Sequence, residues 1–182
     1  MGRTDARPPF MTVGLDRGNV HRGNEKSGAV FSACENYRYT LWRIWGGNGL
    51  VQFIGLNPST ADHERSDPTV TRCINFARRW GYGGLVMTNI FAFRATHPRD
   101  MKSSGSPIGR DNDEALKVTR SYCTEAVAAW GVHGTFWGRE EQVANLLLGR
   151  RLVSLGETKA GHPRHPLYIP ADTDRKEWSC GS

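Results

Sequence analysis

The sequence predicts an α/β protein, a three-layer α/β/α domain with a mostly parallel central sheet of about four to five strands. Short apolar runs at 51–54, 85–89, 125–131 and 151–156 end at glycine or polar residues, as buried strands do. Helical patterns separate these runs, and such crossovers favour parallel pairing. A length of 182 residues with 38% apolar content suits one domain with a single core.

The first strand is predicted at 37–45, where aromatic or aliphatic residues alternate with polar ones. Gly46-Gly47-Asn48-Gly49 follows directly and is typical of a tight turn. The alternation and the turn together predict an antiparallel hairpin between 37–45 and the apolar run 51–54. This hairpin is the antiparallel start of the otherwise parallel sheet.

The first helix is predicted to begin after Asp67, whose side chain can cap the N-terminus, with Pro68 in the first turn. Gly81 marks its end. Two further helices are predicted near 111–122 and 136–148. The apolar face of the first helix is formed by Val70, Cys73, Ile74, Ala77 and Trp80.

The chain divides into three parts by composition. Residues 1–30 are polar and glycine-rich with no apolar period, which predicts a flexible N-terminal arm. The folded domain is expected at 31–172, and 173–182 is expected to be a C-terminal tail. No run approaches the length of a membrane span and no signal-peptide pattern precedes the domain, so a cytoplasmic protein without membrane contact is expected.

Charge and cysteine usage restrict the classes of partner and site. The net charge of +6 and pI of about 9.4 favour a polyanionic partner. The four cysteines lie far apart, without a Cys-x-x-Cys pair, and this argues for reduced thiols and against a metal or iron–sulfur site. We therefore expect neither a metal nor a cofactor.

Polar residues follow the predicted strands at the ends where open sheets bind their ligands. Asn57 lies in the loop after 51–54, where Gly55 permits a close approach of the backbone and Pro58 biases Asn57 toward an extended conformation. Asn89 ends the second buried strand, and a loop at 161–168 follows the last one. These strand ends are expected to converge on one cleft.

With these residues in place, the chain resembles a family of unknown function, DUF1643, found in bacteria and phages, over about 31–170. It is also similar in short motifs to the uracil-DNA glycosylase superfamily. The matching motifs, each at a predicted strand end, are Gly55-Leu56-Asn57-Pro58-Ser59, Met87-Thr88-Asn89, Ala128-Ala129-Trp130-Gly131, and His165-Pro166-Leu167 or His162-Pro163. The resemblance implies a uracil-DNA glycosylase-like fold and a DNA glycosylase, which hydrolyses an N-glycosidic bond of a base flipped out of DNA.

The resemblance assigns roles to individual residues. Asn57 would orient the attacking water through its amide oxygen, and His165 or His162 would donate to the base oxygen as negative charge develops. We favour His165, because Leu167 and Tyr168 follow it and could enter the duplex as an apolar wedge. Substrate binding is expected from Gly55, Leu56, Pro58, Ser59, Asn89 and Phe91, and DNA contacts from Arg72, Arg94, Arg164, Leu167 and Tyr168.

The resemblance says less about the substrate and about the group that accepts the proton of the attacking water. Superfamily enzymes strict for uracil carry a bulky tyrosine where this chain has Ser59, so the resemblance implies a 5-substituted pyrimidine, such as a modified base of phage DNA. Asn57 cannot accept a proton as a carboxylate does. Asp62 and Asp67 are the nearby carboxylates that could replace it, although Asp67 is first a helix cap.

Two other functions remain open at this point. The same cleft could serve an N-glycosidase of free nucleotides or nucleosides, or a non-catalytic module that binds a modified base. DNA, either double-stranded with a flipped base or single-stranded, is the expected partner of a monomeric protein. Phage defence, or modification and repair of phage DNA, are the biological settings that the resemblance suggests.

Overall fold

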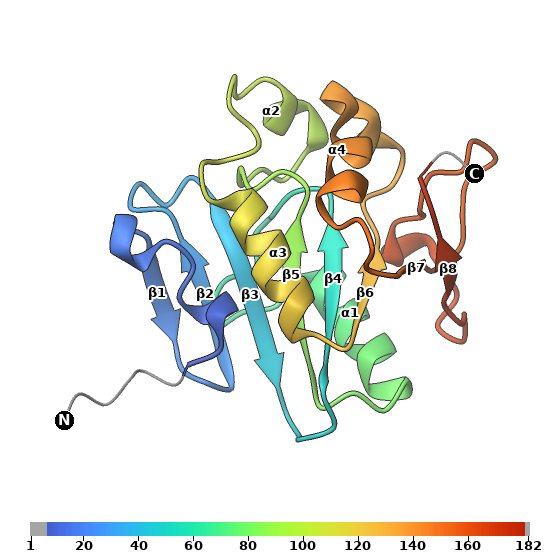
Figure 1. The fold of residues 1–182 in the computed structure, drawn as a ribbon, viewed down its shortest axis with the longest axis horizontal. Helices are drawn as coiled ribbons and strands as arrows, with labels where there is room; N and C mark the ends of the chain where they lie inside the picture. The colour runs from blue at the N-terminus through green and yellow to red at the C-terminus, as the bar shows by residue number, and fades with distance from the viewer. Residues whose placement is uncertain (1–6, 181–182) are drawn as a thin grey trace.

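The computed structural model describes residues 7–180, which form one eight-stranded mixed sheet with the strand order β1-β2-β3-β5-β4-β6-β7-β8 (Figure 1). The parallel ladders join β5, β4, β6 and β7, and the remaining pairs are antiparallel. The strands are β1 (Val20–Gly23), β2 (Ser27–Phe31), β3 (Arg38–Ile44), β4 (Leu50–Gly55), β5 (Gly84–Asn89), β6 (Glu125–Ala128), β7 (Leu152–Ser154) and β8 (Lys176–Trp178).

This sheet contradicts the predicted fold class. We expected four to five mostly parallel strands in a uracil-DNA glycosylase-like three-layer domain, whereas the sheet has eight strands and four of its seven ladders are antiparallel. The sequence reading recognised strands by their apolar runs. The edge strands β1 and β8 read Val-His-Arg-Gly and Lys-Glu-Trp, and lack such a run because much of their surface faces solvent.

The predicted hairpin between β3 and β4 is also wrong. β5 lies between them, antiparallel to β3 and parallel to β4. The glycine-rich turn packs against the start of β5, where the backbone N–H groups of Trp45 and Gly46 both donate to the carbonyl of Gly83, each at 2.8 Å. The turn therefore spans the width of an inserted strand instead of closing a tight hairpin.

The N-terminal segment, for which we expected a flexible arm, is part of the fold from residue 7 onward. It contains two short 3-10 turns, η1 (Pro9–Met11) and η2 (Leu15–Arg17), before β1 and β2. Phe10, Met11 and Val13 are fully buried against the sheet. Residues 1–6 lie outside the described part. At the other end, β8 falls within the expected tail and pairs with β7.

Helices pack on both faces of the sheet, with α3 in front of it and α1 behind it in Figure 1. The sequence predicted α1 correctly, since Asp67 caps it by accepting a hydrogen bond from the N–H of Val70 at 2.8 Å. The α-helices are α1 (Pro68–Arg79), α2 (Pro98–Lys102), α3 (Asn112–Tyr122) and α4 (Arg139–Leu146), and the later 3-10 turns are η3 (Val132–Gly138) and η4 (Pro166–Tyr168).

The register of the parallel strands sets the position of the site. Gly55, the last residue of β4, lies opposite Asn89, the last residue of β5. β6 ends beside them, with Ile54 opposite Ala128. The loops that carry Asn57, Asn89 and Trp130 therefore leave the sheet at one edge. In the described part of the chain, no helix has the length and apolar content needed to cross a membrane.

Candidate functional site

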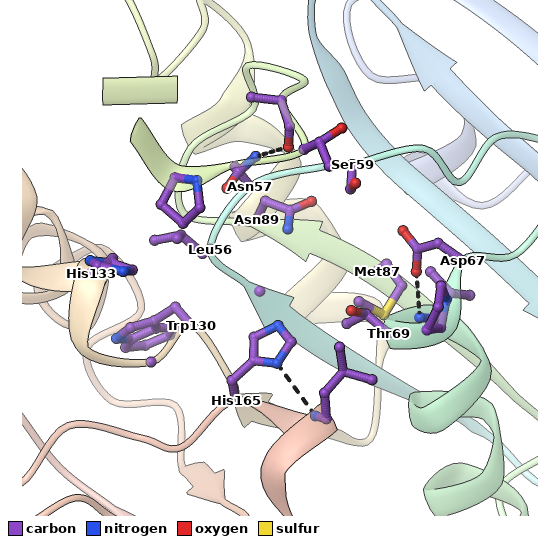
Figure 2. Close-up of a pocket in the computed structure, with 18 of the residues that line it drawn as sticks. Leu56, Asn57, Ser59, Asp67, Thr69, Met87, Asn89, Trp130, His133 and His165 are labelled. Atoms are coloured by element: carbon purple, nitrogen blue, oxygen red, sulfur yellow. Dashed lines mark hydrogen bonds between the residues drawn. The ribbon is translucent and has the colours of Figure 1, made fainter. Parts of the chain in front are cut away.

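A cleft of about 820 Å³ opens at this edge of the sheet, a volume that suits a small-molecule or nucleotide ligand (Figure 2). Its walls come from the loop after β4, the start of α1, the end of β5, the β6–η3 segment and the loop that leads into η4. The polar or ionisable residues that line it include Arg38, Asn57, Ser59, Asp67, Asn89, His133, Arg164 and His165. Asn57, Asn89 and His165 thus share one cleft.

The amide of Asn57 is held in one orientation. Its Nδ2 donates to the carbonyl oxygens of Ala95 at 2.7 Å and Pro58 at 3.0 Å, so the nitrogen must face the protein. The remaining polar atom is Oδ1, which is an acceptor only. The side chain can therefore accept a hydrogen bond from a water molecule in the cleft, and it cannot remove a proton from that water.

Asn89 presents the opposite polarity. Its Oδ1 accepts from the Nη2 of Arg38 at 3.4 Å, which turns Nδ2 toward the cleft. Gly55 is required beside it, because a Cβ there would lie 2.8 Å from this nitrogen. Arg38 is fully enclosed, also donates to the carbonyl of Ala61 at 2.8 Å, and burial lowers its pKa to about 10. A buried arginine thus fixes Asn89 as a donor to the ligand.

His165 is a neutral donor at the opposite wall. Its Nδ1 accepts a hydrogen bond from the backbone N–H of Leu167 at 3.3 Å, so in the neutral ring the proton is on Nε2. Burial lowers the pKa of His165 below its ordinary value of 6.5, and the charge of Asp67 opposes this only in part. Figure 2 shows Nε2 directed into the cleft, toward the side chain of Asn89.

His162 has a different environment. Its Nδ1 lies 2.9 Å from Oε1 of Glu140, whose other oxygen accepts from the indole N–H of Trp130 at 3.1 Å. His162 does not line the cleft, whereas Trp130 does. Of the two histidines named from the sequence, the structure therefore brings only His165 to the cleft, while His162 supports the wall behind it.

Some of the expected substrate-binding residues line the cleft and others do not. Gly55, Leu56 and Ser59 line the cleft together with Asn89. Pro58 is buried next to the cleft and contributes its carbonyl to the Asn57 contact. Phe91 is fully buried and its ring packs on that of Phe136, with centroids 5.8 Å apart. Phe91 is therefore a core residue, and the expected role in substrate binding is wrong.

Some of the expected DNA-contacting residues lie at the cleft and others lie away from it. Arg164 lines the cleft, and Leu167 and Tyr168 stand at its rim with 43% and 75% of their surface exposed. Arg72 donates to the carbonyl of Ile169 and lies in a shallow neighbouring groove along α1. Arg94 donates to the carbonyl of Glu35 at 3.0 Å and packs over Phe31, away from the cleft.

Sequence reasoning missed Arg38 and His133 among the lining residues, and it named Met87 only as part of a motif. The alternation at 37–45 places Arg38 on the polar face of a strand. Such a residue is normally expected to face solvent, so its position in the cleft was not predicted. Of the two carboxylates considered as a base, Asp67 lines the cleft. Asp62, which is also partly buried, does not line the cleft and accepts from the N–H groups of Glu64 and Arg65 instead. No three His, Cys, Asp or Glu side chains gather as metal ligands between residues 7 and 180.

A family model with the description "Protein of unknown function (DUF1643)" matches residues 38–167. The matched region begins at Arg38 and ends at Leu167, and nearly all the lining residues of the cleft fall within it. No curated protein and no solved structure shows a significant match to the chain.

Proposed function

Because the chain belongs to the DUF1643 family, whose description assigns no activity, we propose its function from the cleft: hydrolysis of the N-glycosidic bond of a 5-substituted pyrimidine flipped out of DNA. The protein would act as a monofunctional DNA glycosylase. The observation that carries the proposal is the neutral imidazole of His165, whose Nε2–H faces the amide donor of Asn89 across the cleft.

Two neutral donors suit a departing pyrimidine. When the bond between C1′ and the base nitrogen breaks, its electron pair goes to the base, and negative charge develops on the carbonyl oxygens. Donors fixed in advance in a water-poor cleft stabilise that charge more than solvent would. Nε2 of His165 and Nδ2 of Asn89 are fixed in this way by the contacts with Leu167 and Arg38. The outward-facing oxygen of Asn57 is available to orient the water that attacks C1′.

DNA is the proposed partner because of the rim. Leu167 and Tyr168 are exposed residues two and three positions after His165, where a wedge could fill the space left by a flipped base. Arg164 adds a positive charge at the cleft, and the net charge of +6 favours a polyanion over an isolated base. The short motifs similar to the uracil-DNA glycosylase superfamily point the same way.

The test is incubation of the purified protein with oligonucleotides that carry uracil or various C5-substituted pyrimidines, in single and double strands. Alkali-labile abasic sites should appear with wild type and be strongly reduced with Asn57→Ala. Release of bases from monomeric nucleotides in preference to DNA would replace the proposal with a nucleotide N-glycosidase. Salt-dependent DNA binding without any abasic product would replace it with a binding module.

Ser59 gives a prediction about substrate choice. Its small side chain lines the same cleft as Asn89 (Figure 2), so a bulky substituent on the base can be accommodated there. Ser59→Tyr should reduce kcat/KM for C5-substituted bases at least about tenfold, because the ring would occupy that space. Activity on unsubstituted uracil, assayed in parallel, should be retained. Equal loss on both substrates would disprove a steric role for Ser59.

A further inference from the structure

The two carboxylate oxygens of Asp67 differ in their hydrogen bonding. One oxygen caps α1 by accepting from the N–H of Val70 at 2.8 Å. The other has no hydrogen-bond partner among the described residues, and Figure 2 shows it turned away from the helix. Asp67 is only partly buried and lines the cleft. The cap thus anchors a carboxylate that keeps one oxygen available to a ligand.

The charge of Asp67 acts on the two groups that prepare the cleft for the base. It raises the pKa of His165 and of Arg38, and in both cases it opposes the lowering caused by burial. Among the described residues that line the cleft, Asp67 is the single carboxylate. The cleft thus contains donors at His165 and Asn89 and one anionic acceptor at the start of α1.

The proposed reaction needs such an acceptor. Departure of the base leaves positive charge on the sugar, and the attacking water must lose a proton. The amide of Asn57 can orient that water but cannot take its proton. A carboxylate in a partly desolvated cleft can do both missing tasks, because it stabilises the cationic sugar by its charge and accepts a proton.

We propose that Asp67 is a catalytic carboxylate, which stabilises the cationic sugar and accepts the proton of the attacking water. The inference rests on the proposed hydrolysis. The C1′–N bond breaks with its electron pair on the base, and the water oxygen forms the new bond to C1′. The proton of the water passes to the free oxygen of Asp67 and then to solvent, and the base leaves as an anion that is protonated in solution.

The alternative is that Asp67 is only a helix cap, and Asp67→Asn separates the two roles. Asparagine caps helices as well as aspartate, so the contact with Val70 and the fold are retained while the charge is lost. Asp62→Asn is the matched control, because it removes the same charge from the same loop at a side chain that accepts from Glu64 and Arg65 and does not line the cleft.

Both variants are assayed with the best substrate of the wild-type protein. Asp67→Asn should lower kcat about 100-fold with little change in KM, while its melting temperature stays within about 2 °C of wild type. Asp62→Asn should match wild type in kcat and KM. An NMR titration adds a readout without turnover, in which the pKa of His165 should fall in Asp67→Asn and stay unchanged in Asp62→Asn.

The outcomes distinguish this inference from the proposed function. If wild type releases bases and Asp67→Asn does so equally well, the catalytic role of Asp67 is overturned and the glycosylase proposal stands. If wild type releases no base from any substrate, the proposed function fails and the catalytic role fails with it. An unchanged His165 titration in Asp67→Asn would show that the charge does not act across the cleft.

Discussion

Replacing His165 with alanine is expected to slow base release about 100-fold, with a smaller effect on KM. The reason is the loss of a fixed neutral donor that acts mainly when charge has developed on the departing base. Such a donor contributes about 3 kcal/mol to stabilisation of the transition state. Single-turnover kinetics on a modified oligonucleotide measure the effect, because they separate the chemical step from product release.

His162→Gln is the control for this prediction. His162 lies three residues away and contacts Glu140 outside the cleft, so its replacement should leave the rate of the chemical step within about threefold of wild type. A large loss with His162→Gln and none with His165→Ala would reverse the assignment. The two variants together therefore decide which histidine of the 161–168 loop takes part in the reaction.

The same imidazole should make stability depend on pH. The pKa of His165 lies lower in the folded protein than in the unfolded chain, so the unfolded chain binds the proton first as the pH falls below 6.5. The free energy of unfolding should therefore decrease below pH 6.5 and level off once the folded protein is also protonated. Denaturant titrations of wild type and His165→Ala should differ in this slope, which is smaller in the variant.

Replacing Arg38 with methionine is expected to lower kcat/KM about 10- to 100-fold while changing stability by only about 1 kcal/mol. Two effects on stability oppose each other. The pKa of about 10 corresponds to a penalty of about 3 kcal/mol for the buried charge, which methionine removes. Methionine also leaves the acceptors on Ala61 and Asn89 without a donor, at about 1–3 kcal/mol each.

The effect of Arg38→Met on substrate recognition is not offset by an opposing effect. Without the Nη2 contact, the amide of Asn89 is free to rotate and present its oxygen to the cleft, where the base also has an oxygen. Melting experiments and kinetics on the same samples separate the two effects. Discrimination between pyrimidines with a carbonyl and those with an amino group at the same ring position should decrease in parallel with kcat/KM.

Arg43→Met provides the comparison. Arg43 is also a buried arginine of β3, but it donates to the carbonyl oxygens of Asp62 at 2.6 Å and Trp42 at 2.9 Å and does not line the cleft. Its loss should affect melting without changing substrate choice. If Arg43→Met and Arg38→Met had the same kinetic effect, the role of Arg38 in orienting Asn89 would be disproved.

The local features of the fold could be predicted from the sequence. The cap of α1 at Asp67 and the apolar strands around 51–54 and 85–89 depend on residues close together in the chain, and all are present in the structure. The positions of Asn57 and Asn89 after these strands followed from the same patterns. Their meeting in one cleft results from the parallel register of β4 and β5, in which Gly55 lies opposite Asn89.

The remaining features depend on long-range contacts. The pairing of β3 with β5 instead of β4 leaves no local trace, because a glycine-rich turn suits either arrangement. The role of Arg38 could not be predicted either. The alternation of apolar and polar residues at 37–45 predicts that one face of the strand is polar, but it does not show whether that face contacts Asn89 or water. The core position of Phe91 depends on Phe136, a residue distant in sequence.

The insertion of β5 between two sequential strands has a consequence for assembly. β3 and β4 are consecutive in the chain, yet the strand that pairs with both of them is β5, at residues 84–89. β5 joins the antiparallel half of the molecule to the parallel half, and Asn89 is its last residue. The cleft therefore cannot form before the sheet closes around β5, because Gly55 and Asn89 meet only in that ladder.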